Sequence, residues 1–296
     1  MRVLVTNDDG VGSPGLAALA AAMEGDGHDL LVAAPLEDCS GSSSAIGPVA
    51  QSQGISYESV SLPGAEGLEA LGVDGPPALI VLLARLGGFG TPPELVVSGI
   101  NPGHNTGRST LHSGTVGAAL TAANFGISGL AVSTGAGDEI HWDTAARVAV
   151  LATRWLIGAP PTTVINLNVP NVPMSDLTGV SLAHLASFGT VRSAITDAGG
   201  GKLQIELRDT EVELDPDTDT ALVGRGIVAV TPIVGIRAAG ESDVAAFLEN
   251  ELAQPGREWP GGLAAATGGP RDRETSGGQR WRAAPGPPLE PRAGSG

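Results

Sequence analysis

The stretch MRVLVTNDDG at residues 1–10 decides the fold of this chain. The β-branched run from Arg2 to Thr6 is typical of a buried parallel strand, and it stops at the polar turn Asn7-Asp8-Asp9-Gly10. A helix is predicted next, from about Gly15 to Met23, followed by a second apolar run from Asp29 to Ala34. A strand, a helix and a strand in this order predict a parallel sheet with right-handed crossovers.

Strands and helices alternate in this way up to about residue 160. The further elements predicted there are helices at 77–86, 115–125 and 144–157 and strands at 94–98 and 129–133. Beyond residue 163 the period changes to two, which is typical of antiparallel strands of a smaller second region, at 164–169, 203–207 and 227–231. The segment 39–62 is interpreted as a long loop or hairpins, and 242–252 as a helix. The sequence therefore predicts an α/β fold.

Composition and charge narrow the class of protein. Hydrophobic residues make up 42% of the 296 residues, which is typical of a globular chain. The formal charge of −16 argues against binding to a nucleic-acid polymer. Cys39 is the only cysteine, the first residues show no signal-peptide pattern, and no apolar run approaches the roughly 20 residues of a membrane span. We expect a cytoplasmic protein without membrane contact.

The paired carboxylates of Asp8 and Asp9 follow directly after the first strand, at the edge where open α/β sheets bind ligands. Two adjacent carboxylates repel each other unless they are protonated, exposed or bridged by a cation. Oxygen ligands of this kind suit Mg²⁺ or Mn²⁺. The alternative is an ordinary solvated Asp-Asp-Gly turn.

Three other segments end strands or begin helices in the same way. Ser40 follows the second predicted strand, and Asn101 and Asn105 lie in the polar loop 99–113. The run Ser113-Gly114-Thr115 opens a predicted helix, where hydroxyls and free backbone amides form an anion site or simply cap the helix. Together these segments predict a cation site beside a phosphate site, which answers the problem that an acidic chain has in binding a phosphate.

A competing motif overlaps the first turn. Gly10-Val11-Gly12-Ser13-Pro14-Gly15 matches G-x-G-x-x-G after a strand, which is the context of a dinucleotide-binding module or an oxidoreductase. Asp8 and Asp9 would oppose a pyrophosphate there, and Pro14 removes a backbone amide from the turn.

These residues resemble a known family. The motifs NDDG at 7–10, SG at 40–41, SGIN at 98–101 and SGTVGAA at 113–119 are similar to those of the SurE family of survival-protein phosphatases, divalent-metal-dependent 5′(3′)-nucleotidases. The similarity continues through NLNVP at 166–170 and Asp219 to VTPI at 230–233, and so covers about residues 1–240. The resemblance implies a Rossmann-like three-layer αβα core with a mostly parallel sheet and a smaller C-terminal part that exchanges between subunits of a homodimer or homotetramer.

The resemblance also implies site residues, domain limits and a reaction. It implies one divalent cation, Mg²⁺ or Mn²⁺, on Asp8, Asp9, Ser40 and Asn101, and phosphate contacts from Asn105, Ser113, Gly114 and Thr115. We predict a Rossmann-like catalytic core at 1–160, a smaller β-hairpin and helix region with oligomer contacts at 161–253, and a disordered tail rich in Gly, Pro and Arg at 254–296. The resemblance implies hydrolysis of nucleoside monophosphates. Our hypothesis is that metal-activated water attacks the phosphorus and that Asp8 either handles the proton of this water or serves as a metal ligand alone.

Departures from the family pattern surround the phosphate site. Cys39 replaces a common arginine, and the loop 108–112 lacks two acids and a tyrosine. His104 and His112 are candidates for protonating the leaving group, but we place neither in the site. The altered loop also leaves open a third reading, a catalytically silent interaction protein. The sequence does not decide which nucleotide, ester position or polyphosphate is preferred.

Overall fold

The computed structural model describes residues 1–47, 54–65, 67–187, 191–199, 202–209, 214–238 and 243–252. The chain forms two compact units, Met1–Arg237 and Ala238–Gly296. The helix α6 (Val244–Leu252) belongs to the second unit and confirms the helix predicted at 242–252. The predicted tail at 254–296 lies outside the described residues, and the predicted domain boundaries at 160 and 253 remain predictions.

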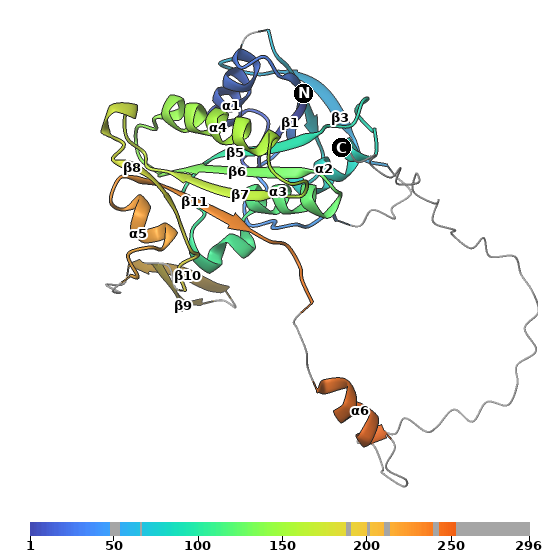
Figure 1. Cartoon of the computed structure of the whole chain (residues 1–296), viewed down its shortest axis with the longest axis vertical. Coiled ribbons are helices and arrows are strands. Elements are labelled where there is room, and N and C mark those ends of the chain that lie inside the picture. The colour runs from blue at the N-terminus through green and yellow to red at the C-terminus, as the bar shows by residue number, and fades with distance from the viewer. Residues whose placement is uncertain are drawn as a thin grey trace, which may run out of the picture. The chain divides into compact units, whose positions relative to one another are not determined.

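A nine-stranded sheet in the order β3-β4-β2-β1-β5-β6-β7-β11-β8 forms the centre of the first unit (Figure 1). Its strands are β1 (Arg2–Thr6), β2 (Asp29–Pro35), β3 (Tyr57–Ser61), β4 (Glu69–Val73), β5 (Leu95–Pro102), β6 (Ser128–Thr134), β7 (Val164–Val169), β8 (Gly179–Leu182) and β11 (Ile227–Ile233). All neighbours are parallel except the pairs β3–β4 and β7–β11. The strands β9 (Val191–Gly199) and β10 (Lys202–Asp209) form a separate antiparallel pair.

Helices cover both faces of the sheet, which makes the three layers visible in Figure 1. α1 (Pro14–Gly25) and α4 (Trp142–Ile157) pack together on one face, and α2 (Pro77–Arg85) and α3 (Gly114–Asn124) pack together on the other. Alternate residues of β1 point to opposite faces of the sheet. Val3 and Val5 belong to the core beneath α1 and α4, whereas Leu4 belongs to the core beneath α2. The short helix α5 (Asp219–Val223) packs against β11, and two 3₁₀ turns are η1 (Gly107–His112) and η2 (Met174–Asp176).

The predicted fold class is confirmed, with differences in detail. The strands β4, β8 and β9 were not predicted, and β5 extends to Pro102, further than the predicted end at residue 98. The strand β7 pairs antiparallel with β11 as predicted, but it also pairs in parallel with β6. The antiparallel pairing predicted for this strand therefore holds on one side only, because its alternating pattern does not reveal which strand lies on its other side.

None of the helices in the described ranges is long and apolar enough to cross a lipid bilayer.

Candidate active site

The loops that follow β1, β2 and β5 meet at one edge of the sheet, because β1 lies between the other two strands. The Cys39 N–H donates to the Asp8 carbonyl oxygen at 2.7 Å and so ties the loop after β2 to the turn after β1. In the next pair of strands, Asn101 of β5 lies opposite Ser133 of β6. The topology thus brings together most of the polar residues that the sequence singled out.

Asp8 is the buried centre of this edge, with only 3% of its surface exposed. The Thr115 hydroxyl donates to its Oδ1 at 2.5 Å, and the Gly114 and Thr115 backbone amides also interact with its carboxylate. Burial raises the Asp8 pKa above its usual value, and these hydrogen bonds partly oppose the shift. Asp8 is therefore joined directly to the start of α3, where Ser113 caps the helix by accepting the Val116 N–H at 3.1 Å.

Asp9 carries a carboxylate charge that the surrounding residues do not balance. Its Oδ2 is buried and has no hydrogen-bond partner within the part of the chain that the structure describes. Burial raises the pKa of Asp9 to about 7, and the charges of Asp8 and Asp38 add to the shift. A buried carboxylate oxygen of this kind, beside a second carboxylate, is suited to a bound cation.

Asn101 and Ser40 are connected to this pair through different contacts. The Asn101 Oδ1 is 3.4 Å from the Thr115 hydroxyl oxygen, so its amide oxygen faces the contact that Thr115 makes with Asp8. Its Nδ2 donates to the Gly103 carbonyl at 2.7 Å, which fixes the amide orientation. Ser40 is exposed, and its backbone N–H donates to Asp38 Oδ1 at 2.7 Å. Among the hydrogen bonds of the described residues, Ser40 is thus tied to Asp8 through the backbone of its neighbour Cys39.

Asn105 is held apart from the Asp8 cluster by its own set of hydrogen bonds. Its Nδ2 donates to the Ser133 hydroxyl at 2.8 Å, which places the side chain beside the strand position opposite Asn101. Its backbone N–H donates to Asn168 Oδ1 at 2.9 Å. Among the contacts of the described residues, no hydrogen bond joins Asn105 to Asp8 or Asp9.

Sequence reasoning gave no role to three buried residues that support this loop. Asn166, Asn168 and Asp219 are fully buried, and each hydrogen-bonds to the segment from Asn105 to Gly107. The signal that could have identified them was the polar side chains of Asn166 and Asn168 in an otherwise apolar strand. Buried amides need partners, and the Nδ2 groups of these two asparagines find theirs in the Asn105 carbonyl of the candidate site.

The glycines of the G-x-G-x-x-G motif have other structural roles. Gly10 has a φ of +99°, the left-handed region that favours glycine in a turn. A Cβ on Gly15 would lie 2.1 Å from the Ile100 carbonyl oxygen, so glycine permits α1 to approach β5 closely. Turn formation and helix packing therefore account for both positions without a dinucleotide.

The available donor atoms limit which metal fits. Across the described ranges there is no group of three or more His, Cys, Asp or Glu side chains that could hold a metal ion. The candidate ligands are two carboxylates together with neutral amide and hydroxyl oxygens. Such a set of hard oxygen atoms fits Mg²⁺ or Mn²⁺ and lacks the nitrogen and sulfur ligands that zinc sites use.

Comparisons with known proteins identify the family to which the chain is similar. The family model described as survival protein SurE matches residues 3–190. The protein named 5′-nucleotidase SurE from Marinobacter nauticus is 34% identical over 274 residues, which cover 91% of this chain and 99% of that protein. The one from Chloroflexus aggregans is 37% identical over 243 residues, 79% of this chain and 92% of that protein. The crystal structure of the SurE protein from Aquifex aeolicus aligns with a TM-score of 0.68 and 25% identity, over 85% of this chain and all of that one. On the fold, the polar edge of the sheet and these matches, the chain belongs to the SurE family.

Proposed function

We propose that this chain is a divalent-metal-dependent phosphatase that hydrolyses nucleoside 5′-monophosphates to nucleoside and phosphate. Its relatives over most of the chain bear the name 5′-nucleotidase SurE. The observation that carries the proposal is the unpartnered, buried Oδ2 of Asp9, next to a buried Asp8 that contacts the start of α3. Nucleoside 3′-monophosphates are the second substrate class to test.

In this proposal Asp8, Asp9, Ser40 and Asn101 hold one Mg²⁺ or Mn²⁺ ion. When bound, the cation acts as a Lewis acid that lowers the pKa of a water molecule and offsets the negative charge of the phosphate. Asp8 receives the proton of the attacking water. Ser113, Gly114, Thr115 and Asn105 bind the phosphate oxygens through hydroxyl, amide and backbone N–H groups, which stabilise the charge of the transition state.

The test is phosphate release from a panel of nucleoside 5′- and 3′-monophosphates, measured with EDTA and after Mg²⁺ or Mn²⁺ is restored. We expect release that disappears with EDTA and returns with metal. The alternative function, a dinucleotide-binding module or oxidoreductase using Gly10, Gly12 and Gly15, instead predicts metal-independent binding of NAD. No release from any nucleotide with any metal would contradict the phosphatase and favour that alternative or a silent interaction protein.

Assembly and location are part of the same proposal. We infer a homodimer or homotetramer from the family resemblance. We infer a cytoplasmic location because the single cysteine excludes an intramolecular disulfide, which suits a reducing compartment. Light scattering of the purified chain decides the oligomeric state, and a monomeric mass at working concentration would contradict this inference.

His104 is expected not to act as the general acid. Its Nε2 lies 2.9 Å from the Val169 carbonyl oxygen, which can only accept, so Nε2 carries the hydrogen. Burial lowers the pKa of His104, which keeps the ring neutral at pH 7. In His104→Gln the amide nitrogen replaces Nε2 as donor, and we expect kcat within about 3-fold of wild type with an unchanged pH profile between pH 5 and 9. A loss of about 100-fold or more, typical of a missing general acid, would contradict this.

A further inference from the structure

The loop between β5 and α3 carries the candidate phosphate ligand Asn105 and leads through η1 to Ser113. One anchor of this loop is β7. The Asn166 and Asn168 side chains both donate to the Asn105 carbonyl, at 2.8 and 3.0 Å, and Asn168 also accepts the Asn105 N–H. This anchor fixes the backbone of Asn105. Other contacts must hold the chain beyond it, toward η1.

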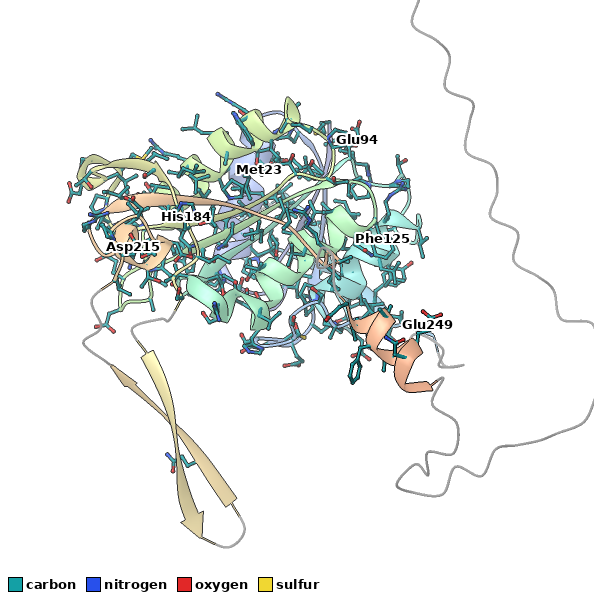
Figure 2. The ribbon with its side chains drawn as sticks, turned by 60° about the horizontal axis from the view of Figure 1, so that its bottom comes forward. Met23, Glu94, Phe125, His184, Asp215 and Glu249 are labelled. Atoms are coloured by element: carbon teal, nitrogen blue, oxygen red, sulfur yellow. The ribbon has the colours of Figure 1, made fainter. Side chains whose placement is uncertain are left out.

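The second anchor is the carboxylate of Asp219, at the start of α5. Its Oδ2 accepts the Gly107 N–H at 2.8 Å, across 112 residues of sequence. Its Oδ1 accepts the Ala186 N–H at 3.0 Å and the Thr220 N–H at 2.8 Å. One buried side chain therefore joins the site loop, the segment after β8 and α5. Figure 2 shows His184 and Asp215, which border these last two segments, close together at this edge of the fold.

The geometry around Gly107 leaves this anchor little freedom. Gly107 has a φ of +60°, and a Cβ there would lie 3.0 Å from the Ala186 carbonyl oxygen. The site loop thus approaches the segment after β8 so closely that a side chain at residue 107 would force its neighbour to shift, and the positive φ also favours glycine there. The Asp219 carboxylate bridges the backbone N–H groups of both sides of this contact, Gly107 and Ala186.

The charge of Asp219 is the unusual part of the anchor. The Asp219 side chain is fully buried, and among the residues whose side chains the structure describes no lysine, arginine or histidine forms an ion pair with it. Burying a carboxylate without a cation is unfavourable unless several hydrogen bonds satisfy it. Only a carboxylate supplies two acceptor oxygens without a donor, so an asparagine would direct an NH₂ group at Gly107 or at Ala186 and Thr220.

We propose that Asp219 is a positioning residue for the phosphate site, an inference that rests on the proposed phosphatase function. Asp219 touches no substrate. It fixes Gly107, two residues after Asn105 and at the first residue of η1, whose other end leads directly into Ser113. Asp219 thereby sets the placement of the phosphate ligands on both sides of Gly107, whereas the proposed metal ligands Asp8 and Asp9 are held by other contacts.

The experiment compares Asp219→Asn with the matched control Asp217→Asn, an exposed aspartate two residues earlier. For Asp219→Asn we expect kcat/KM to fall by about 10–100-fold. A loss of this size, about 10–100-fold, is typical when a residue that holds a ligating group in position is replaced. Affinity for inorganic phosphate should fall with it, while Mg²⁺ binding, followed by calorimetry, should stay within about 2-fold. Hydrogen exchange of peptides covering 103–112 should be faster than in wild type. The control should match wild type in every measurement.

Several results would overturn the proposal. One is a wild-type kcat/KM in Asp219→Asn, and another is an equal loss of Mg²⁺ and phosphate binding. A third is full recovery of kcat/KM at a temperature where the variant is completely folded, which would indicate an effect on stability alone. If wild-type protein hydrolyses no nucleotide, the proposed function falls independently. Hydrogen exchange of 103–112 and phosphate affinity then still decide whether Asp219 positions this loop.

Discussion

Asp9→Asn is expected to abolish metal-dependent phosphate release and to leave the fold intact. The substitution keeps the size of the side chain but removes the charge and replaces one carboxylate oxygen, so the unpartnered Oδ2 no longer serves as a ligand. Residues that only support metal ligands contribute roughly 10–100-fold to activity, and loss of a ligand itself should exceed that range. We therefore expect more than about 100-fold lower kcat, measured as phosphate released with saturating Mg²⁺ or Mn²⁺.

Melting temperatures separate a lost ligand from a lost fold. Wild-type protein should melt at a higher temperature when Mg²⁺ is added, because a ligand that binds only the folded state stabilises it. Asp9→Asn should lose this shift, and its metal-free form should melt no lower than wild type, since the repulsion from Asp8 is removed. Asp29→Asn provides the control, because Asp29 is exposed at the start of β2 and forms a surface ion pair with Arg2. Full activity of Asp9→Asn would refute its assignment as a metal ligand.

Gly114→Ala is expected to reduce kcat/KM by about 100-fold, although alanine ordinarily favours a helix over glycine. A Cβ at this position would lie 2.7 Å from Asp8 Cβ, from Asp8 Oδ2 and from the Ser42 hydroxyl oxygen. Real contacts are not that short, so Asp8 or the start of α3 must shift. The shift separates the two halves of the site, since Thr115 beside it donates to Asp8. Overpacking of this kind costs about 1–3 kcal/mol of stability, which thermal unfolding should also detect.

Gly12→Ala is the matched control and also distinguishes the two functions. Nothing lies within 4 Å of a Cβ placed on Gly12. If the chain is a phosphatase, Gly12→Ala keeps wild-type activity and stability. If the glycines of residues 10–15 instead cradle a pyrophosphate, the extra methyl group obstructs the approach of the ligand. Wild-type kinetics for Gly114→Ala would show that the contact between Asp8 and α3 is not needed for turnover.

The sequence predicted the parts of this molecule that depend on local pattern. The run from Arg2 to Thr6, the helix after it and the second strand all appear within about two residues of their predicted limits. The rule that parallel strands gather their carboxyl ends at one edge placed Asp8 and Asn101 close together, as the contacts through Thr115 bear out. Their roles in binding a metal remain predictions.

The features that sequence pattern missed depend on contacts between distant segments. In β7 the alternation of apolar and amide side chains predicted an antiparallel strand but gave no partner for the amides, and Asn166 and Asn168 are fully buried. Their face of the strand meets the loop that carries Asn105, and no local pattern reveals that partner. The same is true of Asp219, whose contact with Gly107 spans 112 residues and depends on how the sheet orders its strands.

The order of the strands has a consequence for synthesis on the ribosome. The first strand made, β1, is followed closely by Asp8 and Asp9, but the loop that carries Asn105 is held by Asp219, more than two hundred residues later. Since β11 completes the sheet beside β7 only after Asp219 has been made, a nascent chain carries both aspartates long before the rest of the site can close. Activity should therefore appear late and abruptly in translation, when residues up to Ile233 have left the exit tunnel.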